Sequence, residues 1–585
     1  MPHSEKIPLK TFWEKVKQRL SACSTDELRA ILRTMAQETP PTQRQAFLDK
    51  LKSMTKKTAA AVEKALGQEQ LLTDIDKLVD EIEAATKDAE FREEYNEWDD
   101  YYDDEDSPGH YEEFVEPLTA LFDRTQAVFD YANPVLARAA YRKLFAAFSF
   151  EDDYGGGLHE CHLSNVDMGE ACARYLRAVY ETEPSVRQPE ELFDQMQQVG
   201  SWFAGSRPMV DDIIQVSPKP LPDMDHFFRD WIVFLGKQSG SDADTWLREA
   251  IRLSLGTQGL EELVRKEGSN RPHAYLDWFT ALEKEGRHRE VLDAAKEALQ
   301  TLDAKLHIRA AVADHLYAAA SKLNDRDTQC TARMEAFLVE PALVRLLDLW
   351  ETTPDEERSK LMQQAAQHAK EFLAHQLCHS ENFEEAWVED LFEKPRLIDK
   401  SVLAHSYLLA GEWDAAHELA APEEVLGWSS PENSQGLVVP FFLVMLSYKR
   451  LDSLPPNLAQ IWRLALLLRS GLYYWDEEDE GRETSTFERL KCTYAERLAA
   501  LDLDHDKQEQ FLSWCLEVAK NRVNTIVGKK YRKSYEKAAT LIAACSEVLK
   551  LRGDAEGMEE ILNETRGRFP RHRSFQAALT KQLTK

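Results

Sequence analysis

Apolar side chains recur three and four positions apart along most of this chain, which is the spacing of one face of an α-helix. The alternation typical of strands is hard to find. The clearest case is an amphipathic helix expected at 58–90, with an apolar face made of Leu71, Ile75, Leu78, Val79 and Ile82. Because glycine and proline are also few, at 23 residues each, the pattern predicts an all-α protein.

Pairs of helices joined by short turns are the next feature of the pattern. Helices are expected at 114–131 and 134–148, and Gly286, Gly411 and Gly553 each stand between two further helical stretches. A glycine at such a place suits the left-handed conformation that often ends a helix. The sequence therefore predicts a succession of helical hairpins.

One hairpin carries a recognisable motif. Tyr407, Gly411, Trp413 and Ala416 match the Tyr-x3-Gly-x-aromatic-x2-Ala core of a tetratricopeptide repeat. The chain thus resembles a tetratricopeptide-like array, although its turn glycines are not spaced at multiples of the usual repeat of about 34 residues. The resemblance implies an irregular α-solenoid in two or more lobes, a fold that exposes long surfaces for binding.

A second resemblance covers roughly 114–580. The segments that carry it are 281–299, 436–443, 530–539 and 568–575, which look like the helical region of bacterial SWIM-type zinc-finger-associated proteins. The Cys-x-Cys followed by Cys-x-His that defines the zinc site of that family is absent. The resemblance therefore implies the helical solenoid alone, with no zinc and no nucleic-acid role taken over from the finger.

Breaks in the helical pattern divide the chain into segments. The stretch 421–436, which contains two prolines, two glycines and several serines, is expected to be an exposed linker that proteases can reach. The expected segments are an N-terminal helical region (1–90), an acidic-aromatic segment (91–113), a tetratricopeptide-like lobe (114–420), the linker (421–436) and a C-terminal helical lobe with a basic end (437–585).

Charge is distributed unevenly along the 585 residues, which carry −31 in total. Residues 1–60 hold twelve Lys and Arg against six Asp and Glu, and residues 520–585 hold fifteen against seven. The long middle part is therefore strongly acidic, which repels phosphate backbones and suits a protein partner with a basic surface. The same acidity also fits a role in solubility alone.

The acidic-aromatic segment has eleven carboxylates and five aromatic residues within 93–113. In a helix, Tyr95, Trp98, Tyr101 and Tyr102 would share much of one face. These four residues are the candidate partner-binding residues. A linker, a helix docked on its own chain, and a weak site for divalent cations are the alternatives.

Chemically reactive residues form no recognisable catalytic motif. The sequence has no phosphate-binding Gly-x-x-x-x-Gly-Lys-Ser/Thr, no Gly-x-Gly-x-x-Gly and no Gly-x-Ser-x-Gly elbow. The sequence 159–162, His-Glu-Cys-His, and the trio His368, His375 and His379 are weak metal candidates, because adjacent ligands seldom reach one ion and the trio lacks further ligands. We therefore expect no enzyme, no cofactor and no metal site.

The expected location is the cytoplasm. The eight cysteines are scattered singly, which fits reduced thiols, and the N-terminus lacks the apolar core of a signal peptide. The longest apolar run, 437–446, is about half of what a bilayer requires, so it is expected to be a buried helix and no membrane association is predicted.

The expected function is a non-catalytic scaffold or adaptor that holds a protein partner on its helical surface. In length and layout the chain also resembles the target proteins of CRISPR-associated caspase-like proteases. That likeness implies a bacterial defence regulator, controlled by cleavage within 421–436 or by sequestering a basic partner. The third possibility is nucleic-acid binding by a basic cluster that has aromatic neighbours, made of Lys529, Lys530, Arg532 and Lys533.

Overall fold

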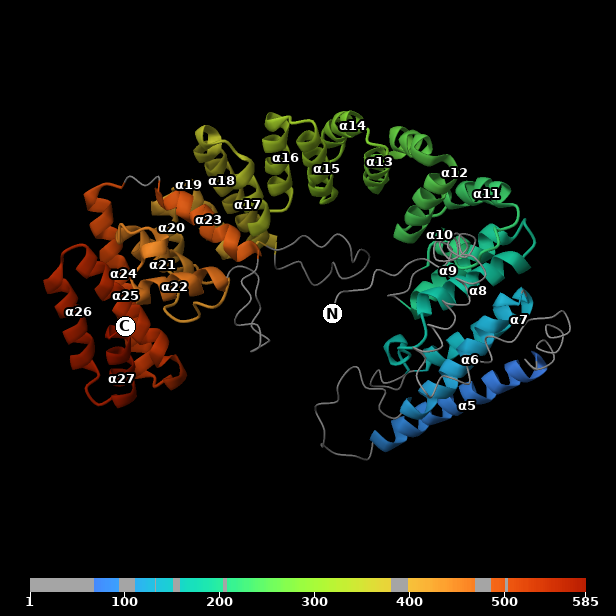
Figure 1. The fold of residues 1–585 in the computed structure, drawn as a ribbon, viewed down its shortest axis with the longest axis horizontal. Coiled ribbons are helices and arrows are strands. Elements are labelled where there is room, and N and C mark those ends of the chain that lie inside the picture. Colours follow the sequence, from blue (N-terminus) through green and yellow to red (C-terminus); the bar gives the residue numbers. More distant parts are fainter. Residues whose placement is uncertain are drawn as a thin grey trace, which may run out of the picture. The chain divides into compact units, whose positions relative to one another are not determined.

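The computed structural model describes residues 68–93, 111–131, 133–150, 158–203, 208–379, 398–468, 485–499 and 503–584. Within these ranges the chain forms α-helices, short 3-10 turns and loops, and no strand. The predicted all-α class is therefore confirmed, and the succession of helices in Figure 1 is consistent with a helical solenoid. The likeness to tetratricopeptide repeats and to the SWIM-associated proteins stays a prediction.

Two compact units make up the chain, Met1–Lys266 and Glu267–Lys585. This division falls inside the stretch 114–420, which the sequence assigned to one lobe. The expected linker at 421–436 lies within the second unit, where residues 421–432 are exposed or half-buried and residues 433–436 are buried.

The first unit begins with three packed helices, α5 (Gln68–Glu93), α6 (Glu112–Asp130) and α7 (Pro134–Ala146). The expected hairpin at 114–148 is confirmed. Asn133 caps α7 by accepting a hydrogen bond from the backbone N–H of Leu136 at 3.2 Å, and Pro134 occupies the first helical position. The expected apolar face of α5 is largely buried, at Leu71, Ile75, Leu78 and Ile82.

Five more helices complete the first unit, namely α8 (Met168–Thr182), α9 (Gln188–Trp202), α10 (Val210–Gln215), α11 (Met224–Leu235) and α12 (Ser241–Glu267). Aromatic rings hold them together. Phe203 lies 5.3 Å from Phe145, and Phe193 lies 5.5 Å from Trp246, with both pairs edge to face. α12 is kinked at Gly256, which has a φ of 62°.

In the second unit, each helix up to α19 packs on its predecessor or on the next but one, as Figure 1 shows for α13 to α18. The helices of this stretch are α13 (His273–Lys284), α14 (His288–Thr301), α15 (Ile308–Lys322), α16 (Arg326–Val339), α17 (Leu343–Thr352), α18 (Asp355–His379) and α19 (Lys400–Ala410). Such neighbour-to-neighbour packing is how an α-solenoid is stabilised.

The turn glycines have the conformation expected from the sequence. Gly286, Gly411 and Gly553 have φ angles of 74°, 81° and 83°, and each stands between two helices. A side chain disfavours this left-handed region, so glycine is the residue that ends the first helix of each hairpin at least cost. The predicted hairpins around all three positions are confirmed.

The end of the chain forms a more compact group around two central helices, α21 (Gln435–Leu446) and α25 (Tyr535–Leu551). Every residue of α21 is buried, which confirms the buried helix expected at 437–446. The surrounding helices are α20 (Trp413–Ala420), α22 (Pro456–Leu467), α23 (Ser485–Ala499), α24 (His505–Gly528), α26 (Ala555–Arg568) and α27 (Arg573–Leu583).

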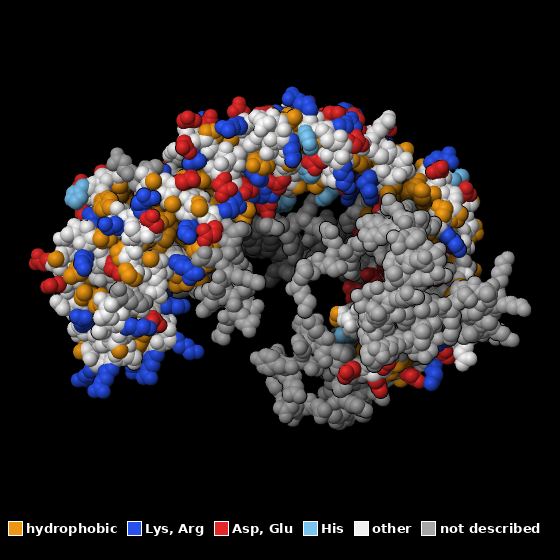
Figure 2. All heavy atoms as spheres, in the orientation of Figure 1, with side chains coloured by type: hydrophobic (Ala, Val, Ile, Leu, Met, Phe, Trp, Pro, Cys, Tyr) orange, Lys and Arg blue, Asp and Glu red, His pale blue; other side chains and the backbone are white. Residues whose placement is uncertain are grey.

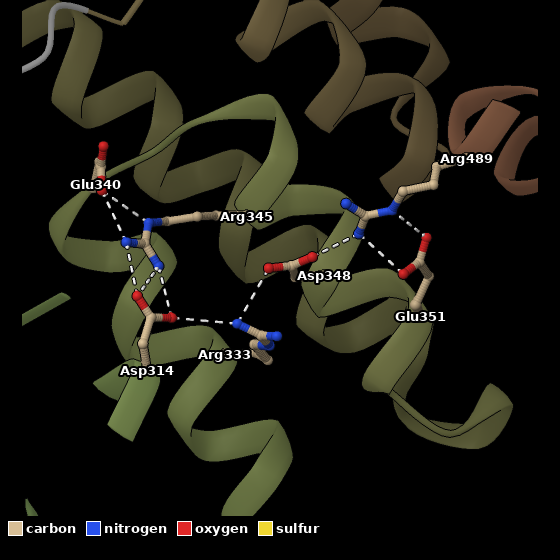
Figure 3. A network of polar contacts seen from close by, with 7 residues as sticks. All are labelled: Asp314, Arg333, Glu340, Arg345, Asp348, Glu351 and Arg489. Carbon is tan, nitrogen blue, oxygen red and sulfur yellow. Dashed lines mark hydrogen bonds and ion pairs between the residues drawn. The ribbon is translucent and has the colours of Figure 1, made fainter. Parts of the chain in front are cut away.

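A chain of ion pairs links helices that are far apart in sequence (Figure 3). It alternates acid and base through Glu340, Arg345, Asp314, Arg333, Asp348, Arg489 and Glu351. Arg489 of α23 donates to Asp348 at 2.6 Å and to Glu351 at 2.7 Å, both on α17. The Glu351 and Asp348 carboxylates raise the pKa of Arg489 against the opposing effect of burial. These contacts fasten α23 to the solenoid-like part of the unit.

Candidate functional site

The candidate residues from the sequence fall into two groups. Tyr95, Trp98, Tyr101 and Tyr102 lie outside the described residues. The basic cluster is described: Lys529 and Lys530 follow α24, and Arg532 and Lys533 lie in the 3-10 turn η8 (Arg532–Ser534). All four basic side chains are exposed, and none forms an ion pair with another residue that the structure describes.

A groove of about 530 Å³ lies beside this cluster, within the second unit. Its walls come from the loop before α21, from α21 itself, from α22, from α24 and from the start of α25. Apolar side chains make most of its floor: Leu426, Trp428, Pro440, Ile461, Leu464, Ala465, Leu468, Ile526 and Leu541. A concave site of this size, largely apolar with a few polar groups, is typical of ligand and peptide pockets.

One wall of the groove is the expected linker 421–436, which is held by hydrogen bonds of its own side chains. The Asn433 side-chain amide donates to the carbonyls of Glu424 and Leu426, both at 2.7 Å. The Gln435 side-chain amide donates to the carbonyls of Ala420 and Glu423, at 3.1 and 2.9 Å. Gln435 is buried. These side chains satisfy four carbonyls in and beside the loop, so hydrogen bonds hold the stretch in place, while residues 421–432 are exposed or half-buried.

Arg522 of α24 is the most unusual charge in the groove. Its guanidinium stacks on the ring of Trp428, with its central carbon 4.3 Å from the ring centroid, and it donates a hydrogen bond to the carbonyl of Val425. Burial lowers the pKa of Arg522 to about 10, so it remains a cation at neutral pH. No carboxylate within the described ranges pairs with it. The groove therefore contains a partly desolvated positive charge with no counter-ion in the described structure.

Further cations border the groove. Lys533 and Lys537 line it four residues apart, and the exposed Tyr531 lines it as well. The carboxylate among the lining residues, Glu536, accepts a hydrogen bond from Lys581 at 2.9 Å. Figure 2 shows Lys and Arg side chains gathered over α27 in this part of the unit. The edge of the groove is therefore positive although the whole chain is acidic.

A second charged cluster was missed by the sequence reasoning. Glu170, Arg174, Arg177 and Glu181 lie along one face of α8 and line a cavity of about 400 Å³ in the first unit. Arg177 is almost fully buried and donates to the carbonyls of Ile213, Ile214 and Lys219. It holds the loop after α10 in place. The spacing Glu-x3-Arg-x2-Arg-x3-Glu was readable in the sequence as one helical face.

The histidine candidates have local structural partners. The backbone N–H of His159 donates to Nδ1 of His162 at 3.2 Å, and Nε2 of His368 lies 2.7 Å from the carbonyl of Leu338. The side chain of His379 lies outside the described residues. In the part of the chain that the structure describes, no three His, Cys, Asp or Glu side chains gather in a way that could hold a metal ion.

No protein-family model matches the sequence, and neither does any curated protein. Among the described helices, none is long and apolar enough to cross a bilayer. The groove and its charges are therefore the basis for a functional assignment.

Proposed function

We propose that this protein is a non-catalytic binding protein that takes a protein partner in the groove between α21, α22, α24 and α25. The observation that carries this proposal is the combination of an apolar floor with cations that have no acidic partner in the described structure. Such a surface suits a partner, because the apolar area gains from being covered and the cations gain from an anion that pairs with them.

The residues around the groove fit binding better than catalysis. Within the described structure, its lining contains no His, Cys or Asp, and its Glu536 is paired with Lys581. The lining does contain Ser, Thr, Tyr and Lys side chains, but a hydroxyl nucleophile needs an adjacent general base, and no such hydrogen-bonded pair joins the described residues of the groove. Lysine, arginine and aliphatic side chains instead hold a ligand through charge and buried area.

Site-specific cross-linking tests this function. Gln460 is an exposed residue at the groove. Replacing it with p-benzoylphenylalanine should give a protein cross-link in native lysate that survives nuclease treatment and is lost when Leu464→Ser is added. The matched control places the same group at the exposed Glu559 on α26 and should give no such product. A groove that cross-links no protein, or only nucleic acid, would refute the proposal.

Nucleic-acid binding is the second candidate, favoured by one observation. Lys529, Lys530, Arg532 and Lys533 are all exposed around Tyr531, whose side chain is 47% exposed and offers a ring for stacking. Binding by four such cations would weaken with salt, with a slope of up to about −3 in log K against log salt. Unchanged binding after all four are replaced by serine would remove this candidate.

The interaction expected for the acidic-aromatic segment is a separate hypothesis. A basic partner for Tyr95, Trp98, Tyr101 and Tyr102 stays a prediction, because these residues lie outside the described ranges. The groove points to the opposite chemistry for its own partner, since its edge is positive.

A further inference from the structure

We infer that the occupant of the groove is an acidic peptide segment of a partner protein, with one or two large apolar side chains set between its carboxylates. This inference rests on the proposed function and specifies the class of partner. The apolar side chains would enter the floor of the groove, and the carboxylates would meet the cations at its edge.

The charge of the groove selects an anion. Arg522 is partly desolvated and has no carboxylate partner among the described residues. Such a cation gains more from an incoming carboxylate than a fully hydrated one does, because part of its hydration has already been lost. Lys533 and Lys537 extend this positive edge over one helical turn. Successive acidic residues of a bound segment would therefore each find a cation.

The floor selects apolar anchors. Leu464, Leu468 and Ile461 come from one face of α22, and Leu541 faces them from α25. A ligand with charge alone would leave this floor in contact with water. Each large side chain buried there contributes binding free energy in proportion to its apolar area. The tightest ligand therefore has both carboxylates and large apolar side chains.

The arrangement of the aromatic rings argues against a nucleic acid in the groove itself. Bases bind by stacking on open aromatic faces. The guanidinium of Arg522 already lies over the ring of Trp428, at 4.3 Å. Tyr531 is the other aromatic residue of the lining, and the remaining apolar side chains are aliphatic. Aliphatic side chains offer an apolar residue a better fit than they offer a nucleotide.

Peptide binding to the full-length protein tests the inference directly. The probe is a short fluorescein-labelled peptide with a Trp-Leu pair between two runs of glutamate, measured by fluorescence polarisation. We expect saturable binding to the wild type. A peptide with glutamine in place of glutamate, and one with serine in place of Trp-Leu, should each bind at least about tenfold more weakly.

Charge-reversal variants locate the binding. Lys533→Glu combined with Lys537→Glu should lower the affinity for the acidic probe by at least about tenfold. The matched control combines Lys370→Glu with Lys550→Glu, which changes the net charge by the same amount. Both positions are exposed in the same unit and lie outside the groove lining, so the affinity for the probe should stay within about twofold of the wild type. Equal losses in the two double variants would show a general charge effect and overturn the inference.

The chain's own acidic run is the rival occupant, because Leu468 lines the groove and residues 476–480 are Asp-Glu-Glu-Asp-Glu. If replacing these five residues with serine tightens probe binding more than about tenfold, the groove is taken by its own chain, and the assignment to a partner fails. Failure of the probe together with a protein cross-link from Gln460 would refute the acidic class alone. Failure of both measurements would refute the proposed function as well.

Discussion

Gly411→Ala is the substitution that tests the local packing most sharply. Gly411 ends α19 with a φ of 81°, and a Cβ atom built there would clash with an Nη atom of Arg497. The Arg497 guanidinium lies over the ring of Trp413 at 4.9 Å from the centroid, so shifting it to make room disturbs that stacking. The variant must therefore adopt a strained backbone and also displace a packed side chain.

The expected loss of stability has two parts, one from the backbone and one from the displaced side chain. An L-residue in the left-handed conformation costs about 1–2 kcal/mol. Losing or distorting the stacking of Arg497 on Trp413 adds about 0.5–2 kcal/mol. We therefore expect Gly411→Ala to lower the free energy of unfolding of the second unit by about 1.5–4 kcal/mol.

Two other glycines of the same unit supply the controls. Gly286 and Gly553 have similar φ angles of 74° and 83°, but a Cβ atom at either position would meet no heavy atom within 4 Å. Alanine at either position should lower the free energy of unfolding only by the cost of its left-handed backbone conformation. Urea unfolding followed by tryptophan fluorescence should show Gly411→Ala to be less stable than both controls by about 0.5–2 kcal/mol. Equal losses at the three positions would refute the steric argument, and addition of Arg497→Ala should remove most of the difference.

Three further outcomes follow from the structure. Burial raises the pKa of Glu249 from 4.5 to about 7, so between these pH values the folded protein keeps a proton on Glu249 that the unfolded chain has lost. The free energy of unfolding should therefore fall by at most about 3 kcal/mol as pH rises from 4.5 to 7. Glu249→Gln should flatten this slope in unfolding measured against pH. Of the six described cysteines, the exposed Cys161 and Cys492 should be alkylated by iodoacetamide in the native protein while the buried ones are protected, as measured by mass spectrometry. Faster alkylation of the buried cysteines would contradict this prediction. Subtilisin should cut 421–436 later than other exposed loops, and an early cut there would contradict the hydrogen bonds described above.

The helices and their turns could be predicted because their signals are local. Apolar spacing marked the buried face of α5, and single glycines marked the ends of α13, α19 and α25. The basic cluster at 529–533 was also visible, since neighbouring lysines and arginines can be read directly from the sequence. Each of these features depends on a few consecutive residues.

The groove could not be predicted because its members are dispersed. Its lining runs from Leu426 to Leu541, and before folding Leu464 and Ile526 are ordinary apolar positions on amphipathic helices. The role of Arg522 depends on Trp428, which is almost a hundred positions away in sequence but in contact in space. Only tertiary packing decides which of many similar side chains become neighbours.

The loop at 421–436 shows how these two levels interact. Its composition suggested an exposed linker, and its residues 421–432 are exposed or half-buried, yet Asn433 and Gln435 satisfy carbonyls of the loop and so help to fix the position of Trp428. A wall that is already ordered loses little conformational entropy when a ligand binds, which favours affinity. Cleavage within 421–436 would release that wall and separate Trp428 from Arg522. Proteolytic control and partner binding, which the sequence left as alternatives, would therefore act on the same groove, and a cut at this loop would lower the affinity of the acidic peptide.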